Sequence, residues 1–149
     1  MGNRAVITTK QGWISKENNL GLYLHWNGGR GSVEAFLAYC KAHGYRSPES
    51  DCYGWAALAA VITNFFGADG LSVGLDIVSR LDCDNYDNGV YIVENWEIVG
   101  RYYAPTQEQQ TREQLGDRLQ AIDDAMPERA RLGADKIAAY IEQREAPAF

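Results

Sequence analysis

The fold is decided by residues 22–37, LYLHWNGGRGSVEAFL, which predict a strand, a glycine-rich turn and the start of a helix. Three glycines, Gly28, Gly29 and Gly31, lie within four residues and let the backbone turn sharply and approach another group closely. The helix begins directly after this turn, so its free N–H groups and the positive end of its dipole lie at the glycines. Such a junction favours an anion, and phosphate is the commonest one.

The side chains of the turn suit a nucleotide. Arg30 offers a planar, bidentate contact to a phosphate. Trp26 offers a flat face for a base or a sugar. The turn therefore supplies five candidate ligand-binding residues: Trp26, Asn27, Gly28, Gly29 and Arg30. The alternative interpretation is a tight strand-to-helix turn that needs glycine for geometry alone.

The segments next to the turn predict two strands and two helices. Strand 4–9 pairs antiparallel with strand 20–26, and a polar connection joins them. A helix follows the turn and ends at Gly44, because its apolar residues share one helix face: Val33, Phe36, Leu37 and Cys40. A second helix, residues 51–66, has Asp51 as its N-cap and Gly67 as its stop. Its middle is nearly all apolar, so we expect it to be buried.

The middle of the chain predicts further strands. Residues 71–77 form a short strand, and residues 90–93 and 97–102 form a hairpin, because β-branched and aromatic residues dominate these stretches. The element order is then β-β-α-α-β-β-β-α-α. This order predicts an α+β fold with a mostly antiparallel sheet, packed on one face by two central helices.

The composition changes after Pro105, where Gln, Glu, Arg, Asp and Ala become frequent. Thr106 and Gln109 fit a capping box, and Pro127 is placed to start another helix. Apolar residues recur at helical spacing: Leu115, Leu119, Ile122, Met126, Ala130, Ala134, Ile137 and Ile141. We therefore expect an α+β ligand-binding core in residues 1–105 and a C-terminal helical hairpin in residues 106–149. The hairpin covers the sheet or pairs with another subunit.

Composition limits the function classes. The chain has 149 residues, 46% of them hydrophobic and 23% charged, which is typical of one globular, soluble domain. The longest apolar run is too short to cross a bilayer, and no secretion signal is evident, so we expect a cytosolic protein. The net charge is −6, with no basic tail, which argues against general DNA or RNA binding. Acidity of this degree favours either solubility or mimicry of nucleic acid.

Metal and disulfide sites are not expected. Cys40, Cys52 and Cys83 are odd in number and form no C-x-x-C pair. Residues 82–89 have the composition of a calcium loop but not its spacing: with Gly89 at the sixth position, Tyr86 is third and Asn95 is twelfth. A turn capped by its own Asn and Asp side chains fits better.

Three residues complete the candidate ligand set. Asn85 and Asn88 have a further interpretation, since a side-chain amide pairs with the edge of an adenine or with ribose hydroxyls. Arg101 lies within a predicted strand, so we expect a defined partner, either a carboxylate or a phosphate. For any one of the arginines, a salt bridge is the alternative.

The sequence predicts a binding protein rather than an enzyme. It contains no G-x-S-x-G, H-E-x-x-H or G-x-x-x-x-G-K-[ST] motif. A nucleophile formed by one of the cysteines with His25 stays open, although a core thiol and an unrelated histidine are the simpler interpretation. We therefore expect no catalytic residues, no cofactor and no metal.

Several segments, residues 4–7, 22–30, 53–55, 64–67 and 84–91, resemble a small family found in phages and prophages of Gram-positive bacteria, the first-described phage anti-Thoeris family. The resemblance covers about residues 3–103. Members of that family are sponges that capture the cyclic ADP-ribose isomer made by bacterial TIR immune enzymes, without degrading it. The resemblance implies homo-oligomers with the nucleotide held between neighbouring subunits by aromatic, asparagine and arginine contacts.

The resemblance thus implies a phage anti-defence protein that acts in the host bacterial cytoplasm by sequestering a cyclic nucleotide. The residues agree with this ligand: the glycine turn and Arg30 suit the diphosphate, an aromatic face suits the base, and Asn or Asp suits the sugars. An alternative from another class is an acidic protein-binding inhibitor of a host nuclease, CRISPR or restriction system. A third is a small hydrolase or transferase that uses a cysteine.

Overall fold

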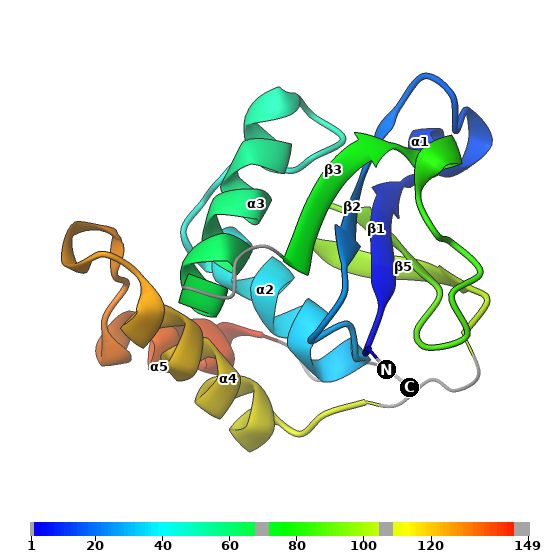
Figure 1. The fold of residues 1–149 in the computed structure, drawn as a ribbon. Helices are drawn as coiled ribbons and strands as arrows, with labels where there is room; N and C mark the ends of the chain where they lie inside the picture. The colour runs from blue at the N-terminus through cyan, green and yellow to red at the C-terminus, as the bar shows by residue number, and fades with distance from the viewer. Residues whose placement is uncertain (1, 68–71, 105–108, 145–149) are drawn as a thin grey trace.

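A five-stranded sheet forms the centre of the fold (Figure 1). The computed structural model describes residues 2–67, 72–104 and 109–144. In spatial order, the strands are β3 (Val73–Ile77), β2 (Leu20–Leu24), β1 (Ala5–Thr9), β4 (Val90–Glu94) and β5 (Glu97–Tyr102). Neighbouring strands are antiparallel except β1 and β4, which are parallel. The predicted α+β fold with a mostly antiparallel sheet is confirmed.

The central strand β1 is buried along its whole length. Because side chains alternate between the faces of a strand, Ala5 and Ile7 belong to the main core on one face, and Val6 belongs to a smaller cluster on the other. Both faces of the sheet are thus covered near its centre.

Two helices follow the glycine turn as predicted: α2 (Arg30–Ala42) and α3 (Cys52–Phe66). The Asp51 side chain caps α3 by accepting a hydrogen bond from the N–H of Tyr53, and α3 ends at Gly67. Gly44, just after α2, has a φ of +77°, a conformation that glycine adopts without strain. The buried faces of both helices join the main core of the sheet.

The C-terminal part contains helices α4 (Arg112–Ala125) and α5 (Ala134–Gln143), and α4 packs against α2 and α3 (Figure 1). Their predicted apolar stripe lies in the main core of the same chain, through Leu115, Leu119, Ile122, Met126 and Ile137. The stripe is therefore not free to form an interface with another subunit. The two helices contact each other, but residues 126–133 separate them and a simple hairpin is not clearly formed.

The predicted ends of these helices need correction. The capping box of α4 is formed by Thr111 and Gln114, not by Thr106 and Gln109, and Thr106 lies outside the described residues. Both pairs have the same spacing, but only the later start places Leu115 in the first turns of a helix that faces the core. Pro127 starts only the 3-10 turn η3 (Glu128–Ala130), and α5 begins later, after Gly133.

A buried carboxylate holds the connection between α4 and α5. Asp123 is 2% exposed; its Oδ1 accepts from the Tyr39 hydroxyl (2.5 Å) and the Leu132 N–H (2.7 Å), and its Oδ2 accepts from the Gly133 N–H (3.0 Å). Burial alone raises the pKa of Asp123, but these three hydrogen bonds outweigh it and lower the pKa below the usual range. The Asp123 carboxylate is therefore ionised, and in this form it fixes the C-terminal helices to α2.

The other face of the sheet carries a short helix that was predicted as an irregular connection, α1 (Lys10–Ile14). The Thr9 hydroxyl caps α1 by accepting from the N–H of Gly12. Trp13 of α1 packs against the smaller cluster and stacks on Tyr102 with ring centroids 4.5 Å apart. Five residues are too few to show a helical period, so the sequence pattern could not indicate this helix.

Candidate functional site

The glycine turn is built mainly by Gly28. A Cβ at this position would lie 2.5 Å from the carbonyl oxygen of Asn3, so residue 28 must be glycine for the turn to pack against the start of β1. Gly29 has an ordinary extended backbone, and a Cβ there would meet only the Asn3 side chain, at an ordinary contact distance of 3.8 Å. Asn27 adopts a φ of +57°, and Trp26 is 45% exposed with its ring edge-on to His25. Geometry alone therefore explains Gly28 but not Gly29.

The N-terminus of α2 is open. Gly29 is its N-cap residue, and no side chain caps the helix. The N–H of Val33 bonds to the carbonyl of Gly29, but the N–H groups of Arg30, Gly31 and Ser32 have no acceptor within the described ranges. These donors and the helix dipole favour an anion at this end of α2.

Arg101 lies beside the same turn through Tyr91. The fully buried Tyr91 donates its hydroxyl to the Gly28 carbonyl oxygen at 2.7 Å. The guanidinium of Arg101 stacks on the Tyr91 ring, with Cζ 3.9 Å from the ring centroid, and its Nη2 donates to the carbonyl oxygen of Asn88 at 2.8 Å. Tyr91 therefore connects β5 to the glycine turn, and Arg101 is placed by the ring rather than by a carboxylate.

Two arginines meet here with unused donors. The Nε atoms of Arg30 and Arg101 are both buried and have no hydrogen-bond partner in the part of the chain that the structure describes. Burial lowers the pKa of Arg101, and the nearby charge of Arg30 lowers it further. Unpaired, buried donors on like charges are costly, so this arrangement suits an anion that satisfies both.

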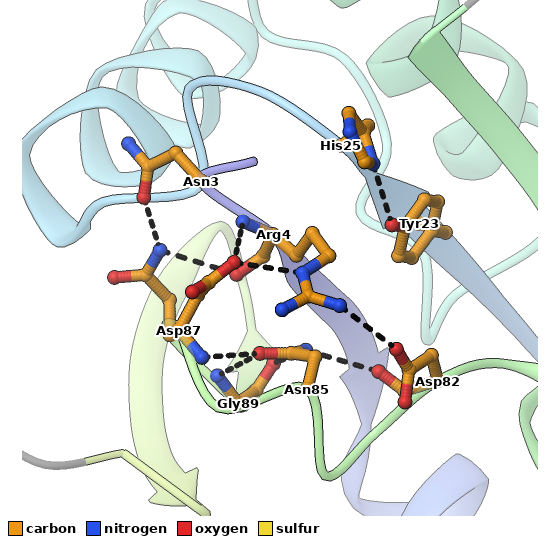
Figure 2. Close-up of polar contacts among 9 residues, drawn as sticks. Asn3, Arg4, Tyr23, His25, Asp82, Asn85, Asp87 and Gly89 are labelled. Carbon is orange, nitrogen blue, oxygen red and sulfur yellow. Dashed lines mark hydrogen bonds and ion pairs between the residues drawn. The ribbon is translucent and has the colours of Figure 1, made fainter. Parts of the chain in front are cut away.

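The loop of residues 82–89 is fixed to the start of β1, as Figure 2 shows. Asn85 is 1% exposed, and its amide group donates to the carbonyls of Asp82 and Gly89. Its side-chain oxygen accepts from the N–H groups of Asp87 and Gly89. The Asn85 amide is thus fully used in closing the loop, so Asn85 is not available to a ligand and leaves the candidate site.

Asn88 is also held by the protein. Its Nδ2 donates to the side chain of Asn3 and to the carbonyl of Arg4 (3.1 Å). Arg4 in turn donates from Nε to Asp87 at 2.8 Å, and this bond holds the pKa of Asp87 below its usual range (Figure 2). Asn88 therefore acts on the site through its carbonyl, which positions Arg101.

The interpretation of residues 82–89 as a turn rather than a calcium loop fits this network. Across residues 2–67, 72–104 and 109–144, no three His, Cys, Asp or Glu side chains are grouped so that they could hold a metal ion.

A cavity of about 590 Å³ adjoins Arg30. It lies between α2, β5, residues 109–115 and α5, and its volume falls within the range of about 300–1,000 Å³ that is common for small-molecule sites. Its polar lining comes from Arg30, Glu34, Lys41, Glu97, Gln109, Gln110, Thr111, Arg112, Gln143 and Arg144, and its apolar lining from Ile98, Leu115 and Tyr140.

The cavity is basic in an acidic protein. Among the described residues, four cationic side chains line it (Arg30, Lys41, Arg112 and Arg144) against two carboxylates (Glu34 and Glu97). The described part of the lining therefore carries +2 in a chain whose net charge is −6. A local excess of positive charge with partly buried walls attracts anionic ligands.

A second hollow, of about 620 Å³, lies between α3 and residues 126–130. Its walls include Ala56, Ala57 and Ala60, and Arg46, in the loop before α3, is paired with Asp51 at 2.9 Å. It holds no unpartnered buried donor among those found, so the cavity at Arg30 is the better candidate.

The structure brings together some of the predicted ligand residues. Gly28, Gly29, Arg30 and Arg101 cluster around Tyr91, and Asn88 supports them through its backbone. Trp26 and Asn27 precede the turn and do not line the cavity. Of the predicted residues, Arg30 alone lines the cavity.

Several cavity residues were missed. Arg30, Glu34 and Lys41 follow one another at spacings of four and seven, which places them on one face of α2. That polar stripe was a usable signal. The contributions of Arg112, Tyr140 and Arg144 come from far along the chain, and no local pattern indicates them.

Comparison with protein-family models, curated proteins and solved structures finds no match for this chain. No helix within the described residues is long and apolar enough to cross a membrane.

Proposed function

We propose that the protein is a phage anti-defence protein that binds and sequesters a cyclic nucleotide immune messenger, a cyclic ADP-ribose isomer. The observation that carries the proposal is the pair of arginines at the open N-terminus of α2, Arg30 and Arg101, whose buried Nε atoms have no partner in the described residues. A diphosphate supplies several charged oxygens to such donors. A bound diphosphate accepts hydrogen bonds from the unpaired Nε groups. Their desolvation penalty is then removed, which favours binding.

The cavity supports a ligand larger than a simple anion. Its volume of about 590 Å³ and its net positive lining suit a nucleotide with a diphosphate. The carboxylate of Glu97 offers an acceptor for a ribose hydroxyl, and Tyr140 and Ile98 offer apolar contact for a base or a sugar face. The earlier assignment of the base to Trp26 has less support, since Trp26 lies outside the cavity lining.

Two of the three thiols, Cys40 and Cys83, fit capture rather than turnover, whereas the third, Cys52, is exposed. Burial raises the pKa of Cys40 well above its usual range, and it also raises the pKa of Cys83. A thiol held protonated is a poor nucleophile. The Nδ1 atom of His25 is hydrogen-bonded to the Tyr23 hydroxyl at 3.0 Å (Figure 2), so this nitrogen is engaged with a phenol. Sequestration needs affinity only, which a preformed pocket with a few polar contacts provides.

The resemblance places this activity in the host bacterial cytoplasm and in a homo-oligomer. The apolar stripe of α4 and α5 does not supply the interface, because it is buried in the core of its own chain. Self-association therefore has to use another surface.

A ligand panel tests the proposal. Thermal unfolding is measured with cyclic ADP-ribose isomers and ADP-ribose, and with adenosine as the uncharged control. At a ligand concentration about 100 times the Kd, mass action stabilises the fold by about 2.7 kcal/mol, which is a rise of roughly 5–10 °C for a domain of this size.

The matched control variant is Arg80→Ala, since the Arg80 side chain is exposed and lies in the 3-10 turn η2 (Val78–Arg80), away from the cavity lining. It should respond to the ligands as the wild type does. No shift with any phosphate-bearing compound would overturn the proposal, and capture of a host nuclease instead would favour the protein-inhibitor alternative.

A further inference from the structure

Glu34 lines the cavity. It lies one turn after Arg30 on α2, and its side chain is 19% exposed. Its Oε1 accepts from Gln110 Nε2 at 2.9 Å. Its Oε2 lies 4.0 Å from Arg30 Nε and 3.7 Å from Arg144 Nη2. One carboxylate therefore faces a cation from α2 and a cation from the end of α5.

Both ion pairs are loose. Neither distance from Oε2 is short enough for a hydrogen bond, and Arg30 Nε has no hydrogen-bond partner in the described chain. Arg144 is shared, because its Nη2 also lies 3.8 Å from Glu97 Oε2. Glu97 itself has a closer partner in Lys41, at 2.8 Å. Glu34 thus neutralises part of the charge of Arg30 and Arg144 without satisfying their donors.

We propose that Glu34 is an internal counter-ion that competes with the anionic group of the ligand for Arg30 and Arg144. This inference rests on the proposed function, since it concerns the same cavity. A phosphate in the cavity hydrogen-bonds the two arginines directly and takes over the role of the carboxylate. Glu34 keeps its bond to Gln110, whose amide also donates to the carbonyl of Gly31 at 3.0 Å.

Replacement of the Glu34 carboxylate by a bound phosphate connects α2 to the C-terminal helix α5. Arg144 lies at the end of α5, and its carbonyl accepts from Arg112 Nη2 at 3.1 Å. A phosphate bound to both Arg30 and Arg144 therefore bridges α2 and α5. The ligand class that fits is a phosphate or diphosphate ester, and the carboxylate limits affinity for any singly charged anion that cannot replace it.

The test is the substitution Glu34→Gln, which keeps the shape and the acceptor for Gln110 but removes the charge. Calorimetric titration with inorganic pyrophosphate and with ADP-ribose should show binding about tenfold tighter than in the wild type, because the negative charge that competes for Arg30 and Arg144 is gone. Glu17→Gln removes the same charge from an exposed position between α1 and β2 and should leave affinity unchanged.

A second variant covers the case in which Glu34→Gln fails to fold. Glu34→Asp keeps the charge but draws the carboxylate back by one methylene from Arg30 and Arg144, and it should bind pyrophosphate more tightly than the wild type by a smaller factor. Equal or weaker binding by the substituted protein, while the wild type binds, would overturn the counter-ion role and leave the proposed function standing. If the wild type and the variants all fail to bind either anion, both the proposed function and this inference are wrong.

Discussion

Arg101→Met is expected to separate binding from stability. The methionine side chain is unbranched and of similar length, so it can still cover the Tyr91 ring. The substitution removes the cation–π contact at 3.9 Å, worth about 0.5–2 kcal/mol, and one charge-assisted hydrogen bond to the Asn88 carbonyl, worth about 1.5–3 kcal/mol.

The same substitution also removes an unfavourable group. The Nε of Arg101 is buried without a partner among the described residues, and such a donor costs about 1–3 kcal/mol. Replacing a desolvated charge by an apolar side chain is often neutral or stabilising. The losses total about 2–5 kcal/mol and the gain about 1–3 kcal/mol, so the free energy of unfolding should fall by about 1–2 kcal/mol.

Binding should respond differently. If Arg101 contacts the phosphates, its loss removes charge-assisted bonds worth at least about 2 kcal/mol, which weakens ADP-ribose binding about 30-fold. The assays are urea denaturation and calorimetric titration, with Arg80→Met as the exposed control. A variant that loses more than about 2 kcal/mol of stability but binds as the wild type does would show that Arg101 is structural and does not bind the ligand.

Three further outcomes are expected. Arg30→Ala should weaken nucleotide binding tenfold or more by calorimetry, about 1.4 kcal/mol, with nearly unchanged folding, because its ion pair with Glu34, at 4.0 Å, is loose. Loss of the fold together with binding would indicate a structural salt bridge instead. Asn85→Ala should lower the free energy of unfolding by about 2–4 kcal/mol in urea, because it removes four hydrogen bonds of the 82–89 loop, two of them buried and two partly buried. A change under about 0.5 kcal/mol would contradict that role. The pKa of Asp123 is lowered by folding, so its contribution to the free energy of unfolding is fully present above the unfolded pKa of about 3.9 and is lost as pH falls through the lower folded value. The free energy of unfolding should therefore fall more steeply between about pH 5 and pH 3 in the wild type than in Asp123→Asn, and equal slopes would exclude Asp123 as the cause.

Local sequence patterns predicted the parts of the fold that depend on local physics. The apolar spacing of Val33 to Cys40 and the capping signal of Asp51 are short-range, and the structure has both helices where these signals place them. The capping signal did not predict the start of α4 because two equivalent T-x-x-Q sequences follow one another, and the local pattern does not distinguish them; α4 uses the second, Thr111 to Gln114.

The sequence predicted only the part of the candidate site that lies in the glycine turn. Arg30 stands in a glycine turn whose local sequence suggests an anion. Its neighbours Tyr91 and Arg101 are brought to the turn by the parallel pairing of β1 and β4, which no local pattern indicates. Asn85 shows the reverse limit: its amide looked available in sequence, but the fold of the loop uses all of its hydrogen bonds.

Heat release of the bound ligand shows directly whether the protein captures the messenger without cleaving it. The purified protein is incubated with a TIR-derived cyclic ADP-ribose isomer, excess nucleotide is removed, and the complex is denatured by heat. We expect the intact messenger to appear in the supernatant and to activate its effector still. We expect the Arg30→Ala variant to retain much less of it. A linear or hydrolysed product would mean that the protein is an enzyme, and a supernatant free of nucleotide would contradict binding altogether.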